Sequence, residues 1–188
     1  MTYVVGLDVG HRTIVAAERW LLSLLTTLDR DPARIACTHV MARPTQHVAV
    51  TWTAPRSAPW TAHVAPVRSG ARGVLPTLVA GGLHDAAVTT ATGAAREHAE
   101  RRAGRAVIYP GCARMTGVMR VEDVMQLSAI ERVIMFDGSS PCGVRPRADT
   151  KLDTRDHVRP QWSGGTLTLL VRPSASGHVV PFERPSPG

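Results

Sequence analysis

The chain has 188 residues, 44% of them hydrophobic, and a formal net charge of +7. It is long enough to bury a core, and its apolar content excludes wholesale disorder. No run of about 18 apolar residues occurs, so we expect no membrane-spanning helix and no membrane partner.

The positive charge would attract an anionic small molecule or nucleic acid. Lys151 is the only lysine, and the arginines are spread along the chain. Abundant arginine, alanine, glycine and proline are typical of GC-rich codon usage. Charge therefore permits an anionic partner without identifying one.

Three cysteines, Cys37, Cys112 and Cys142, occur without a CxxC spacing. The odd number argues against a disulfide framework and for a reducing compartment. The N-terminus lacks the basic start and cleavage site of a signal peptide. We therefore expect a cytoplasmic protein.

The N-terminal part predicts a strand, a helix and two further strands. Tyr3–Leu7 is rich in β-branched residues, and Thr13–Leu28 has the helical period with Thr13 as its N-cap. Ile35–Met41 and His47–Thr53 indicate two strands around a turn at residues 42–46.

A proline-, glycine- and alanine-rich segment at residues 54–82 follows. Its prolines forbid a long helix but allow short edge strands around Trp60–Val64 and Val74–Val79. Leu83–Ala103 then predicts a second helix, which Gly104 would end.

The segment 105–136 predicts a strand (Arg105–Tyr109), a loop, a helix (Val118–Leu127) and a strand (Glu131–Phe136). This order indicates a right-handed βαβ crossover with two parallel strands. A long loop at 139–160 follows.

Thr166–Val171 and His178–Glu183 indicate a C-terminal hairpin, and 184–188 a frayed tail. Together these elements predict one α/β domain over 1–183. We expect a mixed, mostly parallel sheet of five to seven strands, about three helices and an antiparallel C-terminal β-hairpin.

The loop YPGCARMTGVMR (109–120) is the first candidate site. A loop between a parallel strand and a helix lies where ligands usually bind, and helix-opening amides favour anions. We predict an anion site formed by Gly111, Arg114, Gly117 and Arg120. The alternative is an ordinary turn with Cys112 as a small filler residue.

Cys112 invites comparison with cysteine phosphatases and rhodaneses, whose C-x5-R motif wraps one oxyanion. Here Arg114 and Arg120 give C-x-R and C-x7-R, and Gly111 stands where the phosphatases have histidine. A cysteine-dependent enzyme using Cys112 is therefore only an alternative prediction.

The segment GLDVG (6–10) resembles the first-strand motif of RNase H-like resolvases and transposases, and of actin-like ATPases. The resemblance implies a metal-dependent nucleic-acid enzyme in which Asp8 holds Mg²⁺. Asp137 follows a later strand and would be the second carboxylate; Asp153 or Asp156 would be the third. The alternative is a buried strand that ends in a turn aspartate.

A hairpin symmetrical about residue 43 would place His39 opposite His47, with Cys37 on the same face. Three such ligands could bind zinc, but no tight ligand spacing supports it, and we predict no metal site.

The leading hypothesis is a non-catalytic cytoplasmic domain that binds an anionic ligand, either a phosphorylated molecule or nucleic acid. It requires no cofactor; only the RNase H-like alternative requires Mg²⁺.

Overall fold

A computed structural model describes residues 2–28, 31, 33–42, 46–55, 64–67, 77–80, 85–136 and 143–182. The chain divides into two compact units, Met1–Ile108 and Tyr109–Gly188. The single domain expected over 1–183 stays a prediction, because a division into compact units does not measure whether they unfold together.

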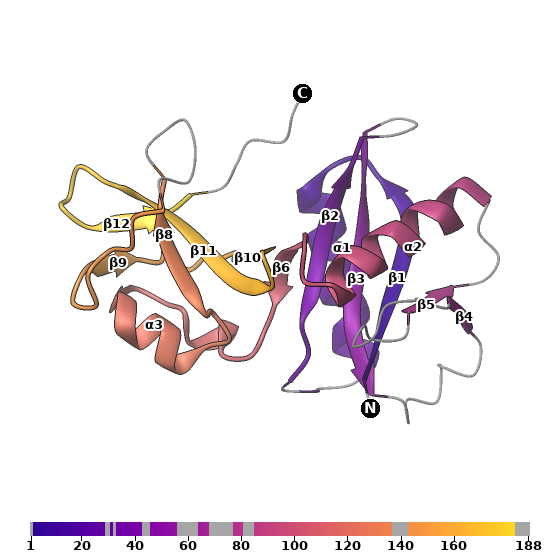
Figure 1. Ribbon diagram of the computed structural model, residues 1–188, viewed down its shortest axis with the longest axis horizontal. Coiled ribbons are helices and arrows are strands. Elements are labelled where there is room, and N and C mark those ends of the chain that lie inside the picture. The colour runs from indigo at the N-terminus through magenta and orange to yellow at the C-terminus, as the bar shows by residue number, and fades with distance from the viewer. Residues whose placement is uncertain are drawn as a thin grey trace. The chain divides into compact units, whose positions relative to one another are not determined.

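The first unit is built on a sheet whose strands lie in the order β4-β5-β1-β3-β2-β6 (Figure 1). Neighbouring strands are antiparallel except β1 and β5, which are parallel. The strands are β1 (Thr2–His11), β2 (Ala36–Met41), β3 (His47–Pro55), β4 (Val64–Val67), β5 (Thr77–Ala80) and β6 (Arg105–Ile108).

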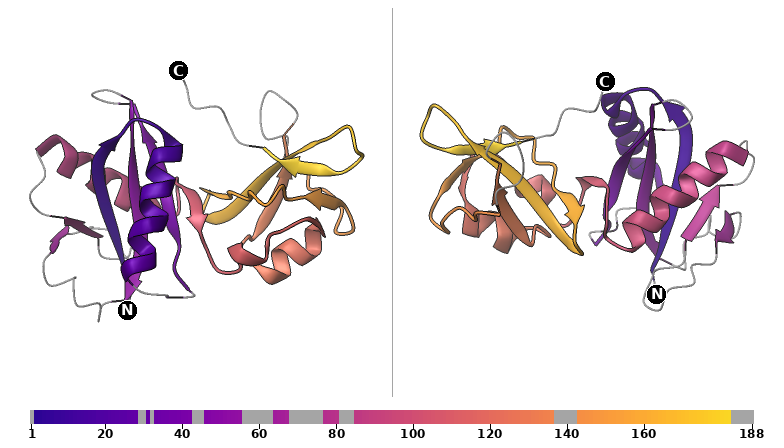
Figure 2. Two further views of the ribbon diagram at one scale, coloured as in Figure 1. Left: turned by 180° about the vertical axis from the view of Figure 1, so that it is seen from behind. Right: turned by 45° about the horizontal axis from the view of Figure 1, so that its top comes forward.

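Helix α1 (Ile14–Leu28) covers one face of this sheet (Figure 2). It begins as predicted, because the Thr13 hydroxyl accepts a hydrogen bond from the Ala16 amide at 3.2 Å. Its apolar side packs on β2 and β3. The core between them contains Val5, Ala17, Leu21, Leu25, Ala36, Val48, Val50, Trp52, Ala54 and Val107.

Helix α2 (Asp85–Ala99) covers the opposite face, where it contacts β1, β3 and β5 (Figures 1 and 2). A Cβ added to Gly6 of β1 would collide with the Ala91 carbonyl and lie 2.9 Å from the Ala95 Cβ. The first glycine of GLDVG therefore permits the close approach of this helix.

The second unit is organised around β11, which pairs antiparallel with β10 and β12 and parallel with β8. On the far side of β12 lies β9, in parallel, followed by β7. The strands are β7 (Val118–Arg120), β8 (Arg132–Met135), β9 (Lys151–Asp153), β10 (Gln161–Ser163), β11 (Thr166–Pro173) and β12 (Val179–Pro181). The β11–β12 pair confirms the predicted C-terminal hairpin.

Helix α3 (Val121–Leu127) buries Val121 and Val124 and contacts β7 and β8 (Figure 1). The short 3₁₀ helix η2 (Cys112–Arg114) precedes it. The unit has its own buried side chains, including Tyr109, Ile130, Leu152, Leu167 and Leu169.

The mixed α/β class and the three helices agree with the sequence prediction across the described residues. The mostly parallel sheet is wrong, because most neighbouring strands are antiparallel. The predicted parallel pairing of strands 105–109 and 131–136 is also wrong. β6 pairs antiparallel with β2, and β8 pairs with β11.

Two local predictions also need correction. Residues 118–120 form β7, so the helix expected at Val118 begins at Val121. In the β2–β3 hairpin His39 faces Ala49, and His47 faces Met41. The register that would place His39 opposite His47 is therefore wrong.

Asp137, the tail 184–188 and much of the segment 54–82 lie outside the described residues. Within the described part, no helix is both long and apolar enough to cross a membrane.

Candidate functional site

The loop after β6 is held by its own backbone. The Cys112 amide donates to the Tyr109 carbonyl at 3.0 Å, and the Arg114 amide to the Gly111 carbonyl at 2.9 Å. Gly111 has φ +82°, and a Cβ there would collide with the Leu127 carbonyl and lie 2.6 Å from the Ser128 Cα. Gly111 is thus required by close packing against the end of α3.

Gly117, at the other end of the loop, is bound to the segment 154–156. Its amide donates to Asp156 Oδ1 at 3.0 Å, and its carbonyl accepts from the Thr154 amide at 2.9 Å and from the Thr154 hydroxyl at 2.8 Å. A carboxylate of the chain therefore uses an amide that the sequence assigned to a ligand anion.

The two predicted arginines lie on the surface. Arg114 is exposed at the end of η2. Arg120 is also exposed, and its Nη1 donates to Glu122 Oε1 at 3.2 Å. Anion binding by these four loop residues stays a prediction.

Cys112 is half-buried at the start of η2. Burial, and second the nearby Cys112 thiol, raise the pKa of Tyr109, whose hydroxyl donates to the Val158 carbonyl at 3.1 Å. Among the described residues no side chain hydrogen-bonds to the Cys112 thiol. No general base therefore accompanies it in that part of the chain.

Asp8 is buried near the end of β1, with 4% of its surface exposed. Its Oδ2 accepts a hydrogen bond from His47 Nε2 at 2.8 Å, and its Oδ1 accepts one from the Gly10 amide at 2.9 Å. Both carboxylate oxygens are thus engaged within the protein. These surroundings do not fit a Mg²⁺ site, which needs several converging carboxylates.

Two other carboxylates of the RNase H-like hypothesis are bonded within the second unit. Asp153 and Asp156 accept hydrogen bonds there from the backbone amides of Arg155 and Gly117. Asp137 lies outside the described residues. The described residues contain no group of three or more histidine, cysteine or acidic side chains that could hold a metal ion.

A buried polar cluster joins β2, β3 and α2, and the sequence did not predict it. His39 Nε2 lies 2.9 Å from Thr51 Oγ1, which lies 2.7 Å from His98 Nδ1. His39 Nδ1 lies 3.5 Å from Glu97 Oε2. Glu97, His39 and Thr51 have the order of a catalytic relay.

The cluster is nevertheless closed to substrates. Thr51 has 0% of its surface exposed, and a nucleophile must reach its substrate. Burial lowers the pKa of His98 to about 3, so its ring is neutral near pH 7. The His39 contact lowers the pKa of Glu97, which keeps that carboxylate charged. The cluster connects α2 to the sheet.

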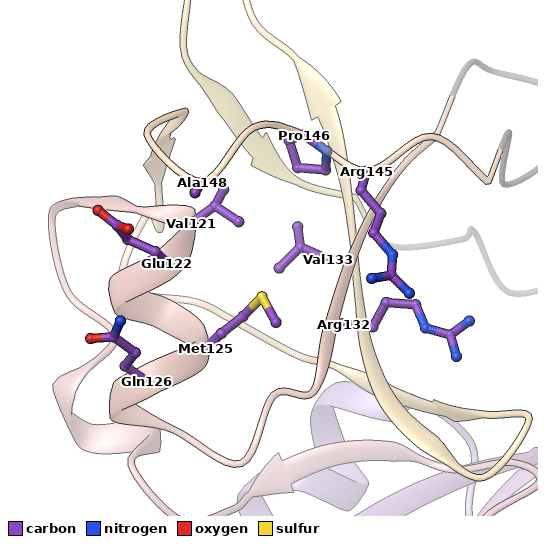
Figure 3. Close-up of a pocket in the computed structure, with 9 residues that line it drawn as sticks. All are labelled: Val121, Glu122, Met125, Gln126, Arg132, Val133, Arg145, Pro146 and Ala148. Atoms are coloured by element: carbon purple, nitrogen blue, oxygen red, sulfur yellow. The ribbon is translucent and has the colours of Figure 1, made fainter.

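A pocket of about 320 Å³ lies in the second unit, between α3, β8 and the segment 145–148 (Figure 3). This volume is in the range of small-ligand sites. Its lining is mainly apolar and is formed by Val121, Glu122, Met125, Gln126, Arg132, Val133, Arg145, Pro146 and Ala148.

Two arginines border this apolar centre on one side. In Figure 3 the Arg145 side chain extends toward Arg132, while the polar ends of Glu122 and Gln126 on α3 point away from the pocket. Among the described residues, neither Arg132 nor Arg145 has a carboxylate partner. Both guanidinium groups can therefore donate to a ligand.

No sequence pattern pointed to this pocket. Arg132 appeared as a strand residue and Arg145 as part of a long loop. They meet because the Met135 amide donates to the Val144 carbonyl at 2.9 Å, which holds the segment before Arg145 against β8.

Comparison of the chain with protein-family models, curated proteins and solved structures finds no match. The candidate site therefore depends on the geometry described above.

Proposed function

We propose that the chain is a non-catalytic, cytoplasmic binding protein for an anionic ligand with an apolar body. The ligand occupies the pocket between α3 and β8, and Arg132 and Arg145 bind its anionic group. The observation that carries the proposal is the pair of guanidinium groups beside an apolar pocket, without carboxylate partners among the described residues.

The chemistry of this pair suits a carboxylate or phosphate. Arginine donates several hydrogen bonds from one planar group, and its bonds to an anion are stronger than neutral ones. Val121, Met125 and Val133 supply the apolar surface for the rest of the ligand. A pocket of this size favours a small group over the phosphate backbone of nucleic acid.

Titration of the full chain with phenyl phosphate, followed by calorimetry, tests the proposal. We expect saturable binding by the wild type and a loss of about tenfold or more in the R132Q/R145Q variant, since bonds to charged groups contribute ~1.5–3 kcal/mol. Phenol, which lacks the anion, should bind more weakly.

Two further variants complete the experiment. Arg172→Gln removes an exposed arginine on β11 that does not line the pocket, and should leave affinity unchanged. The R114Q/R120Q variant tests the loop predicted from sequence. Equal binding by the wild type and R132Q/R145Q would refute the proposed pocket. A loss of binding only in R114Q/R120Q would instead support the loop 109–120 as the anion site.

A further inference from the structure

The edge of β8 that borders the pocket carries unpaired backbone groups. β8 pairs with β11 along one edge. The Phe136 amide donates to the Val171 carbonyl of β11 at 2.7 Å, whereas the Met135 amide points the other way, to Val144. Because successive residues of a strand direct their N–H groups to opposite edges, Val133 faces the same way as Met135.

The neighbouring segment leaves the backbone of Val133 unpaired at this edge. If the segment after Val144 ran on antiparallel to β8, Pro146 would lie opposite Val133. Proline has no N–H group to donate to the Val133 carbonyl. The segment turns to α3 instead, where the Ala148 carbonyl accepts the Glu122 amide at 3.1 Å and the Thr150 carbonyl accepts the Val121 amide at 3.0 Å. It closes one end of the pocket without pairing with Val133.

Val133 therefore contributes both its side chain and its backbone groups to the pocket region. Its side chain lines the pocket, and its N–H and C=O groups point away from β11. Among the described residues, no partner is found for these two groups. Buried backbone groups are almost always hydrogen-bonded, so a ligand that supplies both a donor and an acceptor is favoured.

We infer that the ligand is the C-terminal end of an extended peptide. This inference rests on the proposed function and specifies its ligand. The terminal carboxylate binds Arg132 and Arg145, the last side chain enters the apolar pocket, and the peptide backbone pairs with Val133. Addition of a strand at an open edge, with a pocket for one side chain, is an established mode of peptide recognition.

The chemistry across the pocket agrees with this orientation. A peptide has an anionic end for the arginines and an apolar last side chain for Val121 and Met125 on the opposite wall (Figure 3). The pocket volume of about 320 Å³ accommodates one large aliphatic side chain with part of its backbone. A small organic acid would supply an anion for the arginines but no backbone donor and acceptor for the N–H and C=O groups of Val133.

The test uses the full chain and the fluorescein-labelled peptide Gly-Ser-Thr-Ala-Leu with a free C-terminus, measured by fluorescence anisotropy. Two matched peptides change one feature each. One carries a C-terminal amide, and the other is N-methylated at leucine, which removes one backbone donor. We expect saturable binding by the free acid and at least a tenfold loss for each modified peptide. Changes in the ligand cannot unfold the protein.

Protein variants provide a second arm. R132Q/R145Q should lose discrimination between the acid and the amide, while Arg172→Gln should keep it; unchanged melting temperatures would show that both variants are folded. Binding of phenyl phosphate without binding of the free-acid peptide would reject the peptide ligand and leave the proposed function standing. Failure of both probes would reject both. Equal binding of the N-methylated and unmethylated peptides would overturn the pairing with Val133.

Discussion

Single residues of the two sequence motifs have structural roles that their spacing did not reveal. In GLDVG, Gly6 admits α2, and Asp8 binds His47 and the Gly10 amide. Gly10 has φ +74°, a conformation that side chains other than glycine rarely adopt. The motif suggested a metal site because RNase H-like enzymes and actin-like ATPases share its residue types. The buried contacts of individual side chains cannot be inferred from five residues.

His98 gives a prediction at the scale of one residue. Its pKa is about 3 in the folded protein because of burial and, to a lesser extent, the nearby His39 and Arg101. An ordinary histidine titrates near 6.5, so the unfolded chain binds a proton that the folded chain does not. The contribution of the neutral His98 ring to the stability of the folded protein is complete above about pH 6.5 and is lost as pH falls toward about 3.

We therefore expect the free energy of unfolding to decrease by up to ~1.4 kcal/mol per pH unit below about pH 6 on account of His98. Urea unfolding at several pH values measures this slope. The His98→Gln variant should be less stable at pH 7 but show a shallower slope between pH 6 and 4.5. Equal slopes would contradict the prediction, as would an NMR titration in which the His98 ring of the folded protein protonates near pH 6.

At the scale of elements, periodicity located helices better than it located strands. The apolar period predicted α1 and α2 because each helix packs one face against the sheet of the first unit. Strand β10 was missed, although Gly164 and Gly165 (φ +57° and +84°) form the two-residue turn that joins it to β11. A Gly-Gly pair is a known hairpin signal and could have revealed this strand.

An ion pair between α1 and β6 provides the prediction at this scale. Glu18 Oε1 contacts Arg105 Nη1, and the two side chains are only 11% and 18% exposed. Removing one partner of a buried pair leaves a charge without compensation, at a cost of ~3–5 kcal/mol. Because some exposure remains, we expect Glu18→Leu to lower the free energy of unfolding by about 3 kcal/mol, measured by urea denaturation.

The exposed pair Arg120–Glu122 is the matched control. Its side chains are 63% and 38% exposed. Solvent screens such a pair, so Glu122→Leu should change stability by less than ~1 kcal/mol. Similar losses in both variants would show that the Glu18–Arg105 pair is no stronger than a surface contact.

At the scale of the molecule, the sequence predicted the α/β class but not the direction of strand pairing. Strand–helix–strand order at 105–136 implied a parallel crossover, yet β6 ends in the first unit and β8 pairs with β11 in the second. Alternating hydrophobicity identifies a buried strand but does not show which strand pairs with it. The pocket was unpredictable for the same reason, because Arg132 and Arg145 meet only through the pairing around β8.

The division into two units leads to a final prediction about cooperativity. Each unit buries its own set of apolar side chains, so each can lose its core separately. We expect scanning calorimetry of the full chain to show two transitions. Gly6→Ala should lower only one midpoint, because its Cβ would meet α2, and Gly111→Ala only the other, because its Cβ would meet the end of α3. Overpacking of this kind costs ~1–3 kcal/mol, which lowers the melting temperature of a small domain by at least several degrees. If one transition moves in both variants, the whole chain unfolds as the single domain that its sequence predicted.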